Sequence, residues 1–181
     1  MGVTNQKAIR ELISESAIDA RIKELAEEIT RDFEGQDIAV VCLLKGAVMF
    51  MSRLVARIAL DCTIDFIDIS SYHDGTISSG ELKINRMLDT SLAGKHVLLI
   101  EDIIDTGHTL SYVHDYLKSQ RPTKLKLCML LDKPERRIVN TITPDYVGFV
   151  IPNEFVVGFG LDYNQKYRNL PFIGVLDPDQ L

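Results

Sequence analysis

Short apolar runs alternate along most of the chain with stretches in which apolar residues recur at helical spacing. Continuous apolar runs of about four to eight residues are typical of strands buried on both faces of a parallel sheet. Four such runs occur, at residues 38–44, 64–69, 97–100 and 125–131. Helical spacing occurs in three segments, at residues 16–33, 47–58 and 110–117. The alternation predicts an α/β fold with a central parallel sheet that helices flank on both faces.

A short separate element is predicted before the first helix, because Ile9, Leu12 and Ile13 form a small apolar group there. The helix itself starts near Ser16, and Asp19 follows three residues later, which is the spacing of a capping box. We therefore expect Ser16 to cap this helix.

The remaining strands are short. Residues 82–87 alternate in polarity and predict an antiparallel partner in the sheet. Short apolar segments at 147–151, 155–157 and 172–176 make the last third of the chain rich in strands, which favours a small subdomain beside the sheet. The sequence contains no internal repeat, low-complexity tract or linker, so residues 1–181 are expected to form a single domain.

Composition limits the functional classes. Of 181 residues, 46% are hydrophobic, and no apolar run is long enough to span a membrane. No signal peptide is recognisable, so we expect a cytoplasmic protein without membrane contact. The net charge of −6, from 20 basic and 26 acidic residues, argues against general nucleic-acid binding. Cys42, Cys62 and Cys128 match no metal-site spacing and are expected to be buried free thiols.

A polar stretch at residues 70–80 contains glycine and only two apolar residues, one tyrosine and one isoleucine. Long loops in compact domains are often functional. We expect this stretch to be a lid over a site, and an ordinary long hairpin is the alternative.

The strongest candidate site follows the apolar run at 97–100. After that run come, in order, Glu101, Asp102, Asp105, Thr106, Gly107 and Thr109, and then a helix. The first N–H groups of a helix lack partners within it and lie at the positive end of its dipole, where a phosphate can bind. Gly107 allows close approach to the backbone, and Thr106 and Thr109 can add hydroxyl donors. The pattern predicts an anion site; simple helix capping and a solvated strand end are the alternative.

Other charged residues also stand at the ends of apolar runs: Lys45 with Gly46, Asp132 with Lys133, and Asp162. The carboxyl ends of parallel strands open on one edge of a sheet, where ligands bind in α/β proteins. For any one of these residues alone, a solvated loop charge is the more common explanation. The set together predicts a ligand site.

These motifs resemble those of a known family. Residues 97–110 resemble the phosphoribosyl pyrophosphate (PRPP) motif of the type I phosphoribosyltransferases. Further segments resemble, in order and spacing, the hypoxanthine-guanine phosphoribosyltransferases: Leu44-Lys45-Gly46, Ser70-Ser71-Tyr72, Asp132-Lys133-Pro134 and residues 147–168. The resemblance covers about residues 38–170 and implies the type I phosphoribosyltransferase fold, with a small hood subdomain built from the chain ends.

The resemblance implies purine salvage. The family transfers the 5-phosphoribosyl group of PRPP to hypoxanthine or guanine and yields IMP or GMP and pyrophosphate. Mg²⁺ is implied as the cofactor, because the leaving group is highly anionic. A homodimer or homotetramer is implied in the same way. A PRPP-binding regulator without catalysis and a transferase for xanthine or another base are the alternatives.

The resemblance also assigns residues to PRPP: Lys45, Gly46, Glu101, Asp102, Asp105, Thr106, Gly107, His108, Thr109 and Arg168. Residues 106–109 would hold the 5′-phosphate, while Glu101 and Asp102 would face the ribose hydroxyls. Lys45, at which the family often has a cis peptide bond, would meet pyrophosphate together with Arg168. His108 departs from relatives that carry lysine, so PRPP affinity is expected to fall modestly as pH rises.

For the purine, Asp105 is implied as the acid/base at N7, and Lys133 as the donor to O6, which selects six-oxopurines. Phe155 would stack on the base, and the backbone at Val156 and Asp162 would meet its edge. Three residues are implied as metal ligands: Glu101, Asp102 and Asp162. Two residues would belong to the lid: Ser71 and Tyr72.

Overall fold

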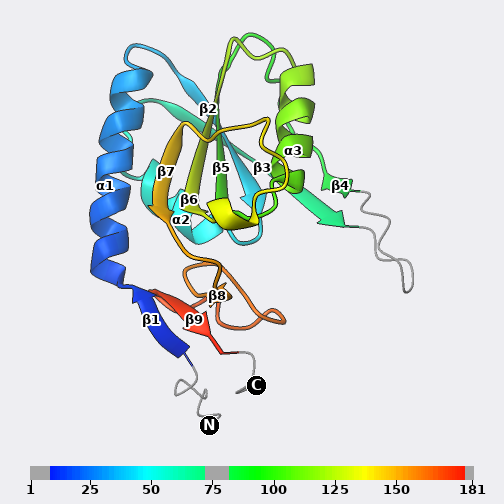
Figure 1. The fold of residues 1–181 in the computed structure, drawn as a ribbon. Coiled ribbons are helices and arrows are strands. Elements are labelled where there is room, and N and C mark those ends of the chain that lie inside the picture. The colour runs from blue at the N-terminus through cyan, green and yellow to red at the C-terminus, as the bar shows by residue number, and fades with distance from the viewer. Residues whose placement is uncertain (1–8, 72–81, 178–181) are drawn as a thin grey trace.

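The computed structural model describes residues 9–71 and 82–177 and has the mixed α/β architecture that the sequence predicts (Figure 1). Its elements are, in chain order, β1 (Ile9–Ile13), α1 (Glu15–Asp32), β2 (Ile38–Leu44), α2 (Val48–Val55), β3 (Cys62–Ser71), β4 (Leu82–Arg86), β5 (His96–Ile104), α3 (His108–Ser119), β6 (Lys124–Asp132), the 3₁₀ turn η2 (Pro134–Arg136), β7 (Tyr146–Val150), β8 (Val156–Val157) and β9 (Ile173–Leu176).

Two sheets are present. The larger has the strand order β4-β3-β2-β5-β6-β7, and its strands are parallel except for the antiparallel edge strand β4. The smaller has the order β1-β9-β8 and is antiparallel. The predicted central parallel sheet, its antiparallel partner and a hood subdomain from the chain ends are all confirmed. The hood lies beside the carboxyl ends of the central strands (Figure 1).

The central sheet is covered on both faces because its strands are apolar at consecutive positions. In β2, Ile38, Val40 and Cys42 pack in one core with α1 and α2. The intervening Ala39, Val41 and Leu43 of the same strand pack in a second core with α3. A parallel strand buried on both faces reads as a continuous apolar run, as this one does.

Strand β5 is longer than predicted. The predicted strand ended at Ile100, but pairing with β6 continues through Glu101↔Met129 and Ile104↔Asp132. The neighbouring strand supplies backbone partners beyond the point where the apolar run stops, so Glu101 and Asp102 lie within the strand rather than after it.

The predicted cap of α1 is wrong. The helix begins one residue earlier, at Glu15, and the Ser14 hydroxyl accepts a hydrogen bond from the Ala17 N–H at 3.2 Å. Ser14 has the extended backbone that an N-cap requires, with φ −70° and ψ 157°. Ser16 lies in the first turn, where its hydroxyl is 3.1 Å from that of Ser14.

Three other predictions can be compared with the fold. The three cysteines are free; Cys42 and Cys128 are buried as expected, whereas Cys62 is partly exposed. Within the described ranges, no helix combines the length and apolar character needed to cross a membrane. Ser71 is the last residue of β3, and Tyr72 with the rest of the expected lid lies outside the described residues.

Candidate active site

Two adjacent carboxylates on β5 form the floor of the candidate site. Glu101 is only 6% exposed, and its Oε2 is buried without a hydrogen-bond partner among the described residues. Burial, and then the charge of Asp102, raise the pKa of Glu101 well above its usual range. Burial also raises the pKa of Asp102 to about 6, although backbone N–H groups and the charge of Arg168 oppose the shift. The fold therefore holds two acids where their negative charge is unfavourable.

The backbone of Gly46 packs directly against Asp102, and that of Gly160 packs against Gly46. A Cβ atom on Gly46 would lie 1.6 Å from Oδ2 of Asp102, and a Cβ atom on Gly160 would lie 2.0 Å from the carbonyl oxygen of Gly46. Gly160 also has φ +103°, a conformation that favours glycine. The peptide bond between Leu44 and Lys45 is cis. The turn after β2, the end of β5 and the hood therefore meet at one point, which only small residues permit.

Arg168 and Asp162 lie at the same point. Nη1 of Arg168 donates to the Gly160 carbonyl at 2.7 Å, and its Nη2 is 2.7 Å from Oδ1 of Asp162. Oδ2 of Asp162 accepts from the N–H of Gln165 at 2.8 Å. Two predicted site residues that are far from β5 in sequence are thus brought close to Asp102, whose pKa responds to both.

The amino end of α3 is open. Gly107 is its N-cap, with φ +87°, and no side chain caps the helix. A cavity of about 240 Å³ lies there, lined by residues 101–107 with Thr109 and Leu110. Helix capping by Asp105 or Thr106, the alternative considered from the sequence, does not occur. The first N–H groups of α3 thus lack a side-chain cap and can bind an anion.

Residues 133–139, which we call the strap, fold back onto this loop. Lys133 donates its N–H to Ile104 at 3.0 Å, and the N–H groups of Ile138 and Val139 both donate to Thr106, each at 3.0 Å. A Cβ atom on Gly107 would lie 2.8 Å from the Val139 carbonyl oxygen, so the strap also requires glycine at the N-cap. The strap joins the loop after β6 to the loop before α3.

Arg137 is the buried anchor of the strap. Its guanidinium pairs with Asp132, and the two side chains are only 10% and 17% exposed. Its Nε is buried without a partner among the described residues, and its Cδ lies 3.1 Å from a Cβ built on Gly107. The aliphatic part of the Arg137 side chain therefore packs against Gly107, the N-cap of α3.

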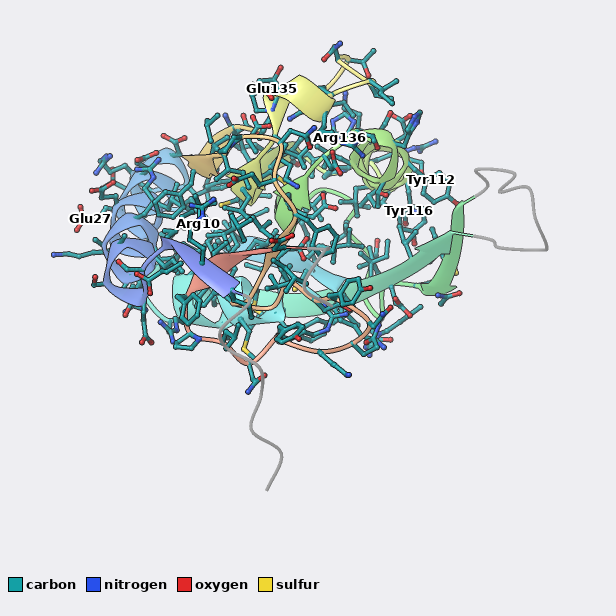
Figure 2. All side chains as sticks on the ribbon, turned by 60° about the horizontal axis from the view of Figure 1, so that its bottom comes forward. Arg10, Glu27, Tyr112, Tyr116, Glu135 and Arg136 are labelled. Atoms are coloured by element: carbon teal, nitrogen blue, oxygen red, sulfur yellow. The ribbon has the colours of Figure 1, made fainter. Side chains whose placement is uncertain are left out.

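Asp105, the predicted acid/base, is paired with Arg136. The Arg136 Nε donates to Oδ1 of Asp105 at 3.0 Å. Lys133 is 7% exposed, and burial lowers the pKa of its ammonium group, while Asp105 opposes and Arg136 adds to that shift. Figure 2 shows Arg136 on the yellow turn η2. The sequence indicated Lys133 and Asp105 but neither Arg136 nor Arg137, whose only signal was their position just after a strand.

The remaining purine candidates lie in and beside the hood. Val156 is buried in β8, where it pairs with Val175. Phe155 is 47% exposed, and its ring makes an edge contact with Tyr163 at a centroid distance of 5.8 Å. Phe155 is therefore not a core residue, and its ring is available to a ligand. His108 is exposed at the start of α3, and Lys45 is exposed in the turn after β2.

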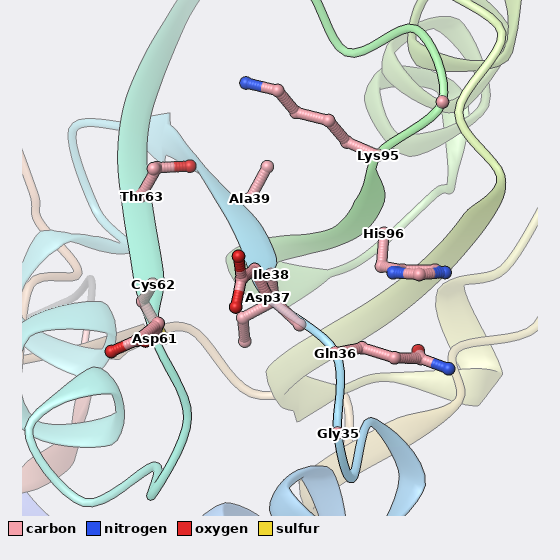
Figure 3. A pocket seen from close by; sticks show the side chains of 11 residues that line it. Gly35, Gln36, Asp37, Ile38, Ala39, Asp61, Cys62, Thr63, Lys95 and His96 are labelled. Atoms are coloured by element: carbon pink, nitrogen blue, oxygen red, sulfur yellow. The ribbon is translucent and has the colours of Figure 1, made fainter.

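A second cavity, of about 590 Å³, lies at the opposite edge of the central sheet (Figure 3). Its lining includes Asp37, Asp61 and Lys95, from the segments that lead into β2, β3 and β5, and Thr63, near the start of β3. Thr63 and Lys95 extend toward one another in Figure 3. None of the residues expected at the site lines this cavity.

The comparisons with known proteins agree with the fold. Residues 10–164 match the family model described as the phosphoribosyl transferase domain, and the chain belongs to this family. The chain is 51% identical over 174 residues to a hypoxanthine-guanine phosphoribosyltransferase of Lactococcus lactis, covering 96% of this chain and 94% of the relative. A crystal structure of a hypoxanthine phosphoribosyltransferase from Staphylococcus aureus superimposes with a TM-score of 0.92 at 45% identity, covering 99% of this chain and 98% of that one.

Not all relatives are of this size. A bifunctional protein TilS/HprT of Listeria innocua is 54% identical over 168 residues, which are 93% of this chain but 26% of that protein. The chain thus spans about a quarter of the length of that relative. The type I phosphoribosyltransferase fold that the motifs implied is confirmed.

Proposed function

We propose that the protein is a hypoxanthine-guanine phosphoribosyltransferase that acts in purine salvage in the cytoplasm as a homodimer or homotetramer. It transfers the 5-phosphoribosyl group from PRPP to hypoxanthine, and to guanine, and releases pyrophosphate. One observation carries the proposal. An uncapped helix N-terminus with φ +87° at Gly107 lies next to the buried carboxylate of Glu101 and the half-buried one of Asp102, in a family whose named relatives carry this activity.

PRPP binding follows from charge and from unpaired backbone groups. The N–H groups of residues 106–109 bind the 5′-phosphate, with hydroxyl donors from Thr106 and Thr109. Glu101 and Asp102 accept hydrogen bonds from the ribose hydroxyls. The backbone at Lys45 and Gly46 and the guanidinium of Arg168 bind pyrophosphate, whose charge they help to neutralise.

The carboxylates fit Mg²⁺. Glu101 Oε2 is a buried oxygen without a partner among the described residues, and burial raises the pKa of both acids, so a cation would stabilise them. No group of three potential ligands stands together in the described part of the chain, which suits an ion that takes its other ligands from phosphate oxygens and water. Glu101 and Asp102 would hold one ion, and Asp162 a second through water. When bound, Mg²⁺ neutralises charge on the leaving pyrophosphate.

The purine meets the strap and the hood. The Lys133 ammonium donates to O6, Phe155 stacks on the ring, and backbone groups near Val156 and Asp162 meet the opposite edge. N9 of the base forms a bond to C1′ as the bond from C1′ to the pyrophosphate oxygen breaks. The proton on N7 passes to the carboxylate of Asp105. Residues 71 and 72 belong to a lid that excludes water.

A steady-state assay with PRPP and Mg²⁺ tests the proposal, with hypoxanthine, guanine, xanthine and adenine offered separately. We expect turnover of hypoxanthine and guanine and none of adenine. Asp105→Asn should lower kcat by about 10²- to 10⁴-fold, because base catalysis is lost while the shape is kept. Asp115→Asn is the matched control, since this side chain on α3 is 77% exposed. PRPP binding without turnover of any base would instead indicate a regulator.

A further inference from the structure

We propose that Arg136 is a positioning residue that orients the Asp105 carboxylate for proton transfer. The inference rests on the proposed function, because it assigns a task to the residue paired with the acid/base. It adds a residue that none of the motifs described above contains.

The contact leaves one carboxylate oxygen free. Arg136 donates to Oδ1 of Asp105 at 3.0 Å, whereas Oδ2 accepts no hydrogen bond from any other described residue. A single donor fixed on one oxygen restricts rotation of the carboxylate and leaves the second oxygen for the N7 proton. Orientation of a base by a third group is a recurrent arrangement in enzymes.

Arg136 belongs to the strap, whose backbone is hydrogen-bonded to the loop that carries Asp105. Its own N–H donates to Lys133 at 3.1 Å in η2, and the N–H of Arg137 donates to Pro134 at 3.2 Å. The two bonds from the end of the strap to Thr106 close the same segment on its other side. Donor and acceptor therefore belong to one hydrogen-bonded unit, and their relative position is set by backbone contacts.

Exposure argues for a positioning role rather than a stabilising one. The side chains of Arg136 and Asp105 are 49% and 39% exposed. Solvated ion pairs contribute little to the free energy of folding. Placement of a base within hydrogen-bonding distance of its proton nevertheless strongly affects rate. Loss of Arg136 should therefore affect kcat more than stability.

The first experiment compares Arg136→Gln with wild type in the forward reaction with hypoxanthine. We expect kcat to fall roughly tenfold while KM for PRPP stays within about twofold. Arg136→Lys, which keeps the charge but not the planar donor group, should recover part of the loss. Arg86→Gln is the control, because Arg86 forms another solvated ion pair, with Asp89 at 2.6 Å, at the far end of β4. It should leave both constants unchanged.

The second experiment asks whether Arg136 acts through Asp105. In an Asp105→Asn background, Arg136→Gln should cost less than about twofold, because there is no longer a base to orient. With 8-azahypoxanthine, whose ring N–H is more acidic, the loss in Arg136→Gln should shrink together with that in Asp105→Asn.

Two results would overturn the inference alone: an unchanged kcat in Arg136→Gln, or an equal loss with and without Asp105. If the unchanged kcat were accompanied by a raised KM for PRPP, Arg136 would be a substrate ligand instead. Absence of turnover by the wild-type protein with every base would overturn the proposed function, and the inference with it.

Discussion

One cavity lies at the carboxyl ends of the central strands, which we call the carboxyl edge, and another at their amino ends, the amino edge. The two edges differ in burial and packing, and their cavity volumes do not reveal this difference. The amino edge carries the larger cavity, about 590 Å³ against about 240 Å³ at the carboxyl edge. Both are lined by acids and hydroxyls. At the amino edge, however, Asp37 and Asp61 are exposed, and a Cβ on Gly94 would meet nothing within 4 Å. At the carboxyl edge Glu101 is 6% exposed, and the backbone of Gly46 packs against Asp102 so closely that a Cβ there would lie 1.6 Å from Oδ2.

The difference shows which features distinguish a site. Exposed charges at an edge are solvated and cost the fold little. Buried acids with raised pKa values cost folding free energy, which a ligand or cation that they bind can offset. The smaller cavity with the buried acids is therefore the candidate site. Five predictions test this contrast, from the largest expected effect to the smallest.

The largest effect is expected from Gly46→Ala, which adds one methyl group at the carboxyl edge. In Gly46→Ala the new Cβ would lie 1.6 Å from Oδ2 of Asp102, so the acid or the turn must move. We expect kcat/KM for PRPP to fall by about 10²-fold, because a shift of about 1 Å in a binding group has this effect.

Gly94→Ala is the matched variant at the amino edge. Gly94 has φ +73°, so alanine costs about 1 kcal/mol in backbone strain, but no atom obstructs it. A lower Tm with unchanged kinetics is expected. Equal kinetic losses in both variants would remove the distinction between the edges.

A pH effect is expected at Lys133. Burial lowers the pKa of Lys133 below the ordinary lysine value of 10.5. The ammonium group that we propose as the donor to O6 is thus lost at lower pH than from an exposed lysine, and KM for hypoxanthine should rise several-fold on the alkaline side. Lys133→Arg should lack this rise. Hypoxanthine itself also ionises, but this affects both proteins equally. It therefore cancels when the wild-type KM at each pH is divided by that of Lys133→Arg.

The same lysine links pH to stability. Between its folded pKa and 10.5, the unfolded chain binds more protons than the folded one, so the free energy of unfolding gains from this group as pH rises. The gain is complete above 10.5 and is lost as pH falls through the folded pKa. Denaturant titrations of wild type and Lys133→Met measure the difference. A slope of the opposite sign would show that attraction to Asp105 outweighs the effect of burial on the pKa of Lys133.

A smaller and opposite pair of changes is expected at Glu101. Its Oε2 is buried without a partner in the described part of the molecule, and burial raises its pKa. Glu101→Gln removes a group whose raised pKa disfavours folding above its unfolded-state pKa, so the free energy of unfolding at pH 8 should rise by about 1 kcal/mol. Turnover with PRPP and Mg²⁺ should fall, because the variant lacks the carboxylate that we propose as a partner of the ribose hydroxyls and of Mg²⁺. Thermal melts and kinetics on one preparation test both signs, and a variant less stable than wild type contradicts the account.

No kinetic effect is expected at the amino-edge cavity. Lys95→Gln and Asp37→Asn change side chains that line it without touching the glycine and carboxylate contacts at the other edge. Both variants should keep kcat and each KM within about twofold, since most surface substitutions have small effects. A clear change in KM for PRPP in either variant would show that the two edges are coupled.

Much of the fold was predictable because β2, β5 and β6 are apolar on both faces. A continuous apolar run followed by helical spacing has few other interpretations. The end of β5 was not predictable, since Glu101 continues in the strand only because Met129 of β6 pairs with it. The start of α1 was missed by one residue, because Ser14 and Ser16 are both good caps and only the backbone at Ser14 decides between them.

The candidate site divides in the same way. Residues 105–109 are contiguous, so their turn before a helix was readable from spacing and resemblance. The pairing of Asp105 with Arg136 joins side chains 31 positions apart, and local pattern does not encode it. Arg137 and Gly160 were likewise missed, since their importance comes from contacts with Gly107 and Gly46. Tyr72 lies outside the described residues, and its role stays a prediction.

The hood has a consequence for the order of synthesis. Strand β1 is made before every other described element, yet its partner in the register Ile9↔Leu176 is the last one. The central sheet can pair on the ribosome once β7 has emerged, while β1 must wait for β9. The part of the candidate site that carries Phe155 and Val156 is therefore completed last, so a nascent chain that stalls after β7 would have the proposed phosphate loop but not the complete proposed purine site.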